Sequence, residues 1–253
     1  EGERILAAVS GGPDSLALLL ALKLLAVKEK INIGCCCVNH HLRAAAGKEA
    51  EFVESVCREW NIPFILKEVD VQSAVRNGGS IETAARDLRY KALREAARGG
   101  GYAKIAVAHH GDDQAETVLY HLLRGSGVTG LSGMKPINGD IIRPFLCVSK
   151  NEIKDFLKDF SYVPCHDESN DVEDAVRNRI RLSLVPELIS YNPRVTESLR
   201  RTADIFREED LFMEEKADVF ISSCVEHDND KCVFFIAYFL VLHIALQRRL
   251  RER

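Results

Sequence analysis

An apolar run, Ile5–Val9, leads directly into the polar hexapeptide SGGPDS at Ser10–Ser15, near the start of this 253-residue chain. The run predicts a buried strand, the two glycines permit a tight turn, and Pro13 is typical of a first helical turn. The free N–H groups of such a turn, together with the helix dipole, favour an anion such as phosphate. The Gly-x-x-x-x-Gly-Lys-Ser/Thr spacing does not occur in the chain, so the usual γ-phosphate chemistry is not indicated. An ordinary strand–helix turn is the alternative.

Strand-like runs alternate with helical patterns as far as about residue 148. The strands are expected at Ile5–Val9, Ile33–Val38, Phe64–Val69, Ile105–Ala108 and, more weakly, Ile141–Leu146, with helices at Asp14–Val27, Ala46–Trp60, Ser80–Ala97 and Asp112–Arg124. This order predicts an α/β fold with a doubly wound, parallel, five-stranded sheet. Ligands of such sheets bind beyond the carboxyl ends of the strands. Polar clusters at Ser10–Ser15, Asn39–Arg43 and His109–Glu116 each follow a predicted strand, so we expect a site at that edge.

Helical patterns alone follow, at Lys150–Phe160, Asp174–Ile189 and Pro193–Phe220. We therefore expect a catalytic domain over residues 1–190 and a long linker helix with a further helical segment over residues 191–253. The apolar stretch 232–246 is shorter than the roughly 20 residues that a membrane span needs. It is expected to be a buried strand or helix, or an interface, and no membrane partner is expected.

Charge and cysteine content limit the function classes. The net charge of −4 argues against a generally basic nucleic-acid coat, although seven arginines between Arg177 and Arg207 allow a local basic face. The eight cysteines include no Cys-x-x-Cys pair, and three of them are consecutive in a predicted strand. Buried free thiols in a reduced, cytoplasmic protein are therefore expected. No secretory signal pattern opens the chain.

The cluster His109–Glu116 opens a predicted helix, on which Asp113 and Glu116 share one face. Acidic residues stabilise a helix N-terminus in any protein, which is the simplest interpretation. The functional alternative is a carboxylate pair that holds a cationic substrate beside the phosphates. A zinc site with His109 and His110 is disfavoured, because the chain has neither His-Glu-x-x-His nor Cys-x-x-Cys spacing.

Three further segments are ambiguous when taken alone. The helix 80–90 has the charged face of a solvated helix or of a substrate site. The glycine-rich segment Arg124–Leu131 is either a helix C-cap or a loop beside the substrate. The arginines of Arg177–Arg181 suit phosphate contacts and a charged surface helix equally.

Taken in order, however, the motifs resemble those of the tRNA(Ile)-lysidine synthases, a group of N-type ATP pyrophosphatases with a PP-loop. The resemblance covers roughly residues 4–200 and rests on Ser10–Ser15, Val38–Arg43, Ala85–Tyr90, His109–Glu116, Arg124–Leu131, Arg143-Pro144 and Arg177–Arg181. Each motif is weak alone, whereas seven in order are specific. The tail Ala245–Leu250 is also similar to the family.

The resemblance implies an ATP-dependent ligase that adenylates the wobble cytidine of a CAU-anticodon tRNA(Ile) and then joins free lysine to it, releasing AMP and pyrophosphate. It implies ATP and Mg²⁺, without confident protein ligands for the metal. The implied catalytic residues are Asp14, Arg89, His109, Asp113 and Glu116; the ATP-binding residues are Ser10, Gly11, Gly12, Pro13, Asp14, Ser15 and His40. Lysine would be held by Asp113, Glu116 and Arg89, and tRNA by Arg124, Arg177, Arg179, Arg181 and Arg201.

Three rival functions remain open. A tRNA thiolase would act on the same ring carbon, but it usually needs the Cys-x-x-Cys ligands that this chain lacks. A catalytically silent RNA-binding protein would not need the phosphate loop or the carboxylates. A ligase acting on a small-molecule carboxylate would not need the arginines between residues 177 and 207. A homodimer is left open as well.

Overall fold

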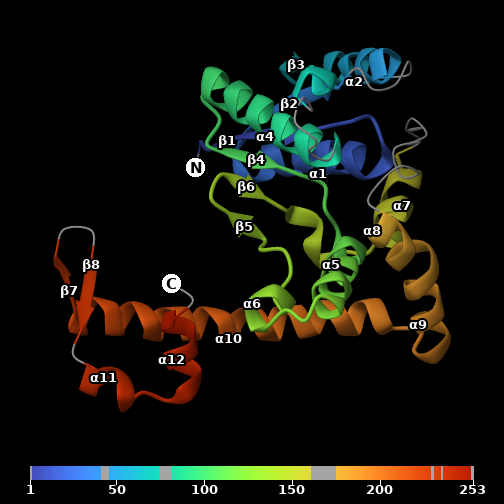
Figure 1. Cartoon of the computed structure of the whole chain (residues 1–253). Coiled ribbons are helices and arrows are strands. Elements are labelled where there is room, and N and C mark those ends of the chain that lie inside the picture. Colours follow the sequence, from blue (N-terminus) through green and yellow to red (C-terminus); the bar gives the residue numbers. More distant parts are fainter. Residues whose placement is uncertain are drawn as a thin grey trace.

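A parallel sheet forms the body of the molecule (Figure 1). The computed structural model describes residues 2–40, 46–74, 81–160, 175–228, 231–234 and 236–251. The strands are β1 (Arg4–Ala8), β2 (Asn32–Asn39), β3 (Phe64–Glu68), β4 (Lys104–Ala106), β5 (Ile137–Asn138) and β6 (Ile141–Ile142), in the order β3-β2-β1-β4-β6-β5. The five predicted strands are present and parallel, which confirms the fold class. A sixth strand, β5, adds an antiparallel edge that two residues are too few to signal in the sequence.

The order of the strands fixes where a ligand can bind. The chain builds outward from β1 to β2 and β3, and then returns to place β4 on the other side of β1. Between β1 and β4 the winding direction therefore reverses, which opens a crevice beyond the carboxyl ends of these two strands. The segments Val9–Ser15 and Val107–Asp113 leave the sheet at this switch point.

Twelve α-helices occur in the described part of the chain, and two of them begin at the switch point. The structure has α1 (Pro13–Glu29), α2 (Ala46–Glu59), α3 (Val71–Ala74), α4 (Ile81–Gly100), α5 (Gly111–Leu123), α6 (Val128–Leu131), α7 (Lys150–Lys158), α8 (Ala175–Arg179), α9 (Val185–Tyr191), α10 (Val195–Cys224), α11 (Ile236–Leu240) and α12 (Ile244–Arg251) among its described residues. A 3₁₀ turn lies at Pro144–Cys147 and a π-helical turn at Ile180–Leu184. The predicted helix 174–189 is thus divided at the π-helical turn.

Two apolar layers cover the sheet. One joins α1, α2 and α7 to one face and includes Leu16, Val53 and Ile153. The other joins α4 to the opposite face and includes Leu93. Because successive strand residues point to opposite faces, Cys35 packs in the first layer and Cys36 in the second. The consecutive cysteines are thus small core residues, as predicted.

The cysteine prediction fails elsewhere. Cys147 is exposed and Cys224 is partly exposed, while Cys35, Cys36, Cys37 and Cys57 are buried. Both exceptions lie outside the predicted strands.

The 30-residue helix α10 crosses beneath the sheet domain and extends well beyond it (Figure 1). At 1.5 Å per residue it is about 45 Å long. It packs against α5 and α6 of the sheet domain and, further along, against α12. Ala203, Asp210 and Ala217 repeat every seven residues on its buried side. The division at residue 190 stays a prediction.

The stretch 232–246 is not a single buried element. It contains the end of β8 (Lys231–Phe234), which pairs with β7 (Val225–Asp228), then α11 and the start of α12. Tyr238, Leu240 and Val241 are more than half exposed, so burial was the wrong alternative for these residues. None of the helices in the described part of the chain is long and apolar enough to span a membrane.

Candidate active site

The loop between β1 and α1 is built around one left-handed glycine. Gly11 has a φ of 90°, which residues with a Cβ rarely adopt. The Ser15 hydroxyl donates to the carbonyl oxygen of Gly12 at 3.0 Å, and accepts from the backbone N–H of Ser10 at 3.2 Å. Pro13 stands in the first turn of α1, and the N-cap Gly12 supplies no side-chain acceptor. The helix N-terminus is therefore open to an anion, as the sequence predicts.

His110 connects this loop to α5 across the switch point. As the N-cap of α5, it accepts from the backbone N–H of Asp113 at its Nδ1 over 3.4 Å, and its own N–H donates to the Asp113 carboxylate over 3.0 Å. Its Nε2 lies 3.7 Å from Oδ2 of Asp14. The next residue, Gly111, has to be glycine, because a Cβ there would lie 2.8 Å from the carbonyl oxygen of Val148.

The two ends of this contact shift each other's ionisation. Burial lowers the pKa of His110, but the hydrogen bond to Asp14 and the charges of Asp113, Asp14 and Asp112 outweigh it and raise that pKa. Burial raises the pKa of Asp14, but the hydrogen bond and positive charge of His110, with nearby lysines, bring it below its ordinary value. An ion pair across the switch point is therefore favoured when His110 is protonated. Since protonated His110 carries a proton on Nδ1 as well, only the neutral form accepts the N–H of Asp113.

His109, by contrast, is surrounded by cations. Burial, followed by the positive charges of Arg143, Arg89, Arg86 and Arg177, lowers its pKa to about 3. Its Nδ1 is buried and has no hydrogen-bond partner within the described residues. His109 is therefore neutral at pH 7 and stands where a phosphate would be attracted to several arginines.

The carboxylates predicted to hold a cation do face one, but it is an arginine. Arg181 donates from Nε to Oε1 of Glu116 at 2.8 Å and from Nη2 to Oε2 at 3.0 Å. Its Nη2 lies 3.5 Å from Oδ1 of Asp113, and Nε of Arg177 lies 3.7 Å from Oε2 of Glu116. Glu116 is only 4% exposed. Such a pocket is suited to a cationic group with several hydrogen-bond donors.

This geometry separates the predicted tRNA contacts into two groups. Arg124, Arg179 and Arg201 are exposed, with Arg124 donating to the Tyr120 hydroxyl at 2.5 Å. Arg177 and Arg181 instead face α5, and a phosphate contact would require them to exchange partners.

The remaining predicted residues lie at the same edge or outside the described chain. His40 directly follows β2 and is half-buried, and Arg89, on α4, contributes to the positive charge around His109. Positions 41–43 of the motif Val38–Arg43 are not among the described residues.

Two residues that support the site were not assigned a function from the sequence. Arg143 is buried, and its Nη1 donates to the carbonyl oxygen of Lys135 at 2.8 Å. Gln114 accepts from the backbone N–H of Met134 at 2.8 Å and so ties α5 to the segment after α6. Both stood in motifs that resemble the family, Arg143 in Arg143-Pro144 and Gln114 in His109–Glu116, but neither was given a role.

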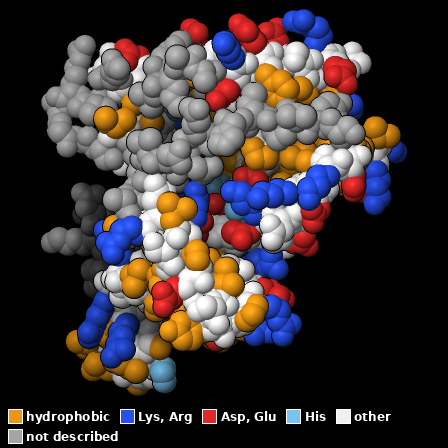
Figure 2. All heavy atoms as spheres, turned by 90° about the vertical axis from the view of Figure 1, so that its right-hand side faces the viewer, with side chains coloured by type: hydrophobic (Ala, Val, Ile, Leu, Met, Phe, Trp, Pro, Cys, Tyr) orange, Lys and Arg blue, Asp and Glu red, His pale blue; other side chains and the backbone are white. Residues whose placement is uncertain are grey.

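Acidic and basic groups alternate around this site. Figure 2 shows Lys and Arg side chains next to Asp and Glu side chains around a hollow in which a histidine is visible. The arrangement combines an open helix N-terminus, cations around His109 and buried carboxylates on α5. It can bind an anion beside a cation, which suits the transfer of a phosphate-linked group to an amine.

Comparison with known proteins identifies the family. Residues 1–188 match the family model of the PP-loop domain. The chain is 38% identical over 254 residues to the tRNA(Ile)-lysidine synthase of Caldanaerobacter subterraneus, covering 99% of this chain and 54% of that protein. It is 36% identical to the synthase of Thermotoga maritima, covering 98% and 60% respectively. For the synthase of Petrotoga mobilis the identity is 40% over 82% of this chain and 68% of the relative.

The chain thus spans between about half and two thirds of the length of these relatives. Among solved structures, the U34-tRNA thiolase of Methanococcus maripaludis, described with its [4Fe-4S] cluster, has a TM-score of 0.65. Its sequence identity is 16%, over 81% of this chain and 72% of that one. This likeness shows a common fold.

Proposed function

Because this chain belongs to the PP-loop domain family, and within it to the tRNA(Ile)-lysidine synthases, we propose that it converts the wobble cytidine of a CAU-anticodon tRNA(Ile) to lysidine. The observation that carries the proposal is the meeting of two groups at the switch point. The carboxylate of Asp14, in the phosphate loop, lies 3.7 Å from Nε2 of His110. His110 in turn precedes Asp113 by three residues and Glu116 by six. ATP and the amine of lysine would thus be held on opposite sides of one histidine.

In the first step, the carbonyl oxygen at carbon 2 of the cytidine attacks the α-phosphate of ATP, and pyrophosphate leaves. The open N–H groups of α1 and the hydroxyls of Ser10 and Ser15 would hold the departing pyrophosphate. Arg89 and Arg143, which lie close enough to His109 to lower its pKa, would offset the charge that develops on the α-phosphate. His109 would then donate or accept a hydrogen bond beside it in its neutral form.

Mg²⁺ fits this loop as a partner of the ATP phosphates. Oδ1 of Asp14 is buried, and no hydrogen-bond partner for it occurs in the part of the chain that the structure describes. The same part contains no group of three or more metal-ligating side chains, and Mg²⁺ is commonly bound through one carboxylate together with phosphates and water. Asp14 would hold the ion, which would supply positive charge to the leaving pyrophosphate.

In the second step, the ε-amine of lysine attacks carbon 2, and AMP leaves. Asp113 and Glu116 would hold the amines of free lysine through charge-assisted hydrogen bonds. A lysine amine has a pKa near 10.4, so it has to lose a proton before it attacks. A carboxylate of this pair would accept that proton, and a second proton leaves the attacking nitrogen when the product forms.

The RNA itself would be held by the exposed arginines. Arg124, Arg179 and Arg201 are proposed to contact its phosphates, and Arg177 and Arg181 to do so by exchanging their carboxylate partners. The target base would have to leave its stack to reach the crevice.

The test is incorporation of labelled lysine into a CAU-anticodon tRNA(Ile) transcript in the presence of ATP and Mg²⁺. Label that becomes acid-precipitable, and that is lost when the wobble cytidine is replaced by uridine, would establish lysidine formation. Asp113→Asn should abolish the incorporation with little change in tRNA binding. Formation of AMP without incorporation would contradict the choice of lysine as nucleophile, and absence of AMP would contradict adenylation.

A further inference from the structure

A basic groove outside the carboxylate site runs along α4. It has a volume of about 580 Å³ and lies between α4 and the edge of the sheet formed by β5 and β6. Five basic side chains and two acidic ones line it, although the chain as a whole has a net charge of −4. One of the five, Arg94, is paired with Asp140 beside the groove, to which its Nε donates at 2.8 Å and its Nη2 at 3.3 Å. Positive charge is therefore concentrated here, and an anionic partner is favoured.

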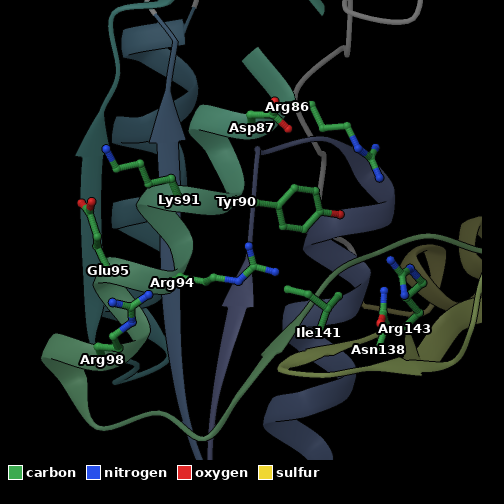
Figure 3. A pocket seen from close by; sticks show the side chains of 10 residues that line it. All are labelled: Arg86, Asp87, Tyr90, Lys91, Arg94, Glu95, Arg98, Asn138, Ile141 and Arg143. Carbon is green, nitrogen blue, oxygen red and sulfur yellow. The ribbon is translucent and has the colours of Figure 1, made fainter. Parts of the chain in front are cut away.

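The basic residues of the groove are regularly spaced. Arg86, Tyr90, Arg94 and Arg98 follow one another at intervals of four residues and thus form one row on α4. At 1.5 Å per residue this row is about 18 Å long. Figure 3 shows the Tyr90 ring and the Arg94 guanidinium pointing from α4 toward Ile141 and Arg143. A row of cations that contains an aromatic ring is typical of grooves that bind single-stranded nucleic acid.

Tyr90 adds a second, independent observation. Guanidinium carbons of Arg86 and Arg94 lie 5.2 Å and 5.9 Å from the centre of its ring. Its hydroxyl is buried, and the described residues provide no hydrogen-bond partner for it. A buried hydroxyl without a partner costs free energy, so a ligand that supplies one would be favoured.

The groove opens toward the candidate active site. Arg86 and Arg143 line it, and both also contribute to the positive charge that lowers the pKa of His109. A polymer whose reactive unit lies beside His109 could therefore continue along α4. A small substrate such as ATP or lysine would not need a row of this length.

We infer that the α4 groove binds the single-stranded RNA next to the nucleotide being modified. Arg98 would contact its phosphates directly, Arg94 would do so by exchanging its partner Asp140, and Tyr90 would contact a ribose or base. The inference rests on the proposed function, because it takes the substrate to be an RNA with an unpaired loop. Duplex RNA would not offer unstacked bases to Tyr90.

The experiment measures binding of a fluorescent CAU anticodon stem-loop to the full chain at several salt concentrations. The double variant Arg94→Ala/Arg98→Ala should weaken binding about tenfold and lower the salt slope by about 2. Alanine favours helix, so α4 should remain folded, which a melting curve checks. The matched control Lys28→Ala/Arg58→Ala removes the same charge from exposed sites on α1 and α2, and should leave binding unchanged.

Two further readouts make the outcome decisive. Tyr90→Phe should weaken binding about threefold without altering the salt slope, since only a neutral hydrogen bond is lost. The groove variant should need more tRNA than the control variant to reach half of its maximal rate of lysine incorporation. The inference would be overturned if the groove variant bound the stem-loop as well as the control variant does, or if the wild type bound a blunt duplex as well as the stem-loop. Lysine incorporation by the wild type would show that the proposed function still holds. Binding without any lysine incorporation would contradict only the proposed reaction.

Discussion

Nε2 of His110 lies 3.7 Å from the carboxylate of Asp14 and thereby joins the phosphate loop after β1 to the helix after β4. The pKa of His110 is raised and that of Asp14 is lowered, so the pair is charged over an extended pH range. On the alkaline side its stabilisation is present below the ordinary histidine value of 6.5, and is lost as pH rises through the raised pKa. On the acid side it is present above 3.8, and is lost as pH falls through the lowered pKa of Asp14.

We therefore predict that His110→Ala reduces the free energy of unfolding most between these two transitions. Above the raised pKa, where neutral His110 caps α5, the loss of the cap should cost about 1 kcal/mol. His110→Asn keeps a cap acceptor and should lose mainly the pH-dependent part. Urea unfolding of both variants and of the wild type, at several pH values from acid to alkaline, measures the difference. Parallel pH profiles for all three proteins would contradict the ion pair.

A second prediction concerns the pairing of Arg181 with Glu116. Among the described residues, Arg181→Ala would leave the buried Glu116 carboxylate with Arg177 alone as a cationic partner, whose Nε is 3.7 Å away. Removing one partner of a buried ion pair costs about 3 kcal/mol. Arg179→Ala is the matched control, because Arg179 is exposed and should change stability by less than about 0.5 kcal/mol. Urea unfolding of the two variants measures the difference. Equal urea midpoints would contradict a stabilising ion pair between Arg181 and Glu116.

The sequence predicts well those parts of the site that depend on local chemistry. A left-handed turn needs Gly11, the start of α1 tolerates Pro13, and the acidic residues near the start of α5 suit its N-terminus. Because strands alternate with helices along the chain, the sheet is parallel and these segments meet at one of its edges, as the strand order confirms. The ion pair between Glu116 and Arg181 has no such signal, because 65 residues separate its members. Alternating arginines fit a carboxylate as well as a phosphate.

The third prediction tests a connection that likewise has no local signal. Asp210 on α10 is 3% exposed; it accepts from Arg249 of α12 at 2.6 Å and from Thr129 of α6 at 2.6 Å. Arg249 also donates to Glu214 at 2.7 Å. The three helices are thus joined at one carboxylate, and α6 belongs to the glycine-rich segment beside α5.

Arg249→Ala should destabilise the protein by about 3 kcal/mol, because within the described chain Asp210 would keep the Thr129 hydroxyl as its one side-chain hydrogen-bond partner. Hydrogen exchange should then accelerate in α12 and in residues 125–131, and less in β1 and β2. The control Arg248→Ala removes an exposed cation from the same helix. If hydrogen exchange accelerates in α12 alone, the contact of Arg249 with Asp210 does not stabilise residues 125–131.

His109 provides the fourth prediction, because its ionisation should report the arrival of a phosphate. In the free protein, burial and four arginines hold its pKa near 3. A bound phosphate would bring negative charge close to those arginines and reduce their effect on the imidazole, so the pKa should rise on ATP binding. The increase should appear as proton uptake below neutral pH and as a shift in the NMR titration of the His109 ring. His109→Gln should abolish that shift and leave the titration of His110 in place. An unchanged His109 pKa, with ATP shown to bind by shifts in the amides of residues 10–15, would mean that the phosphates lie away from these arginines.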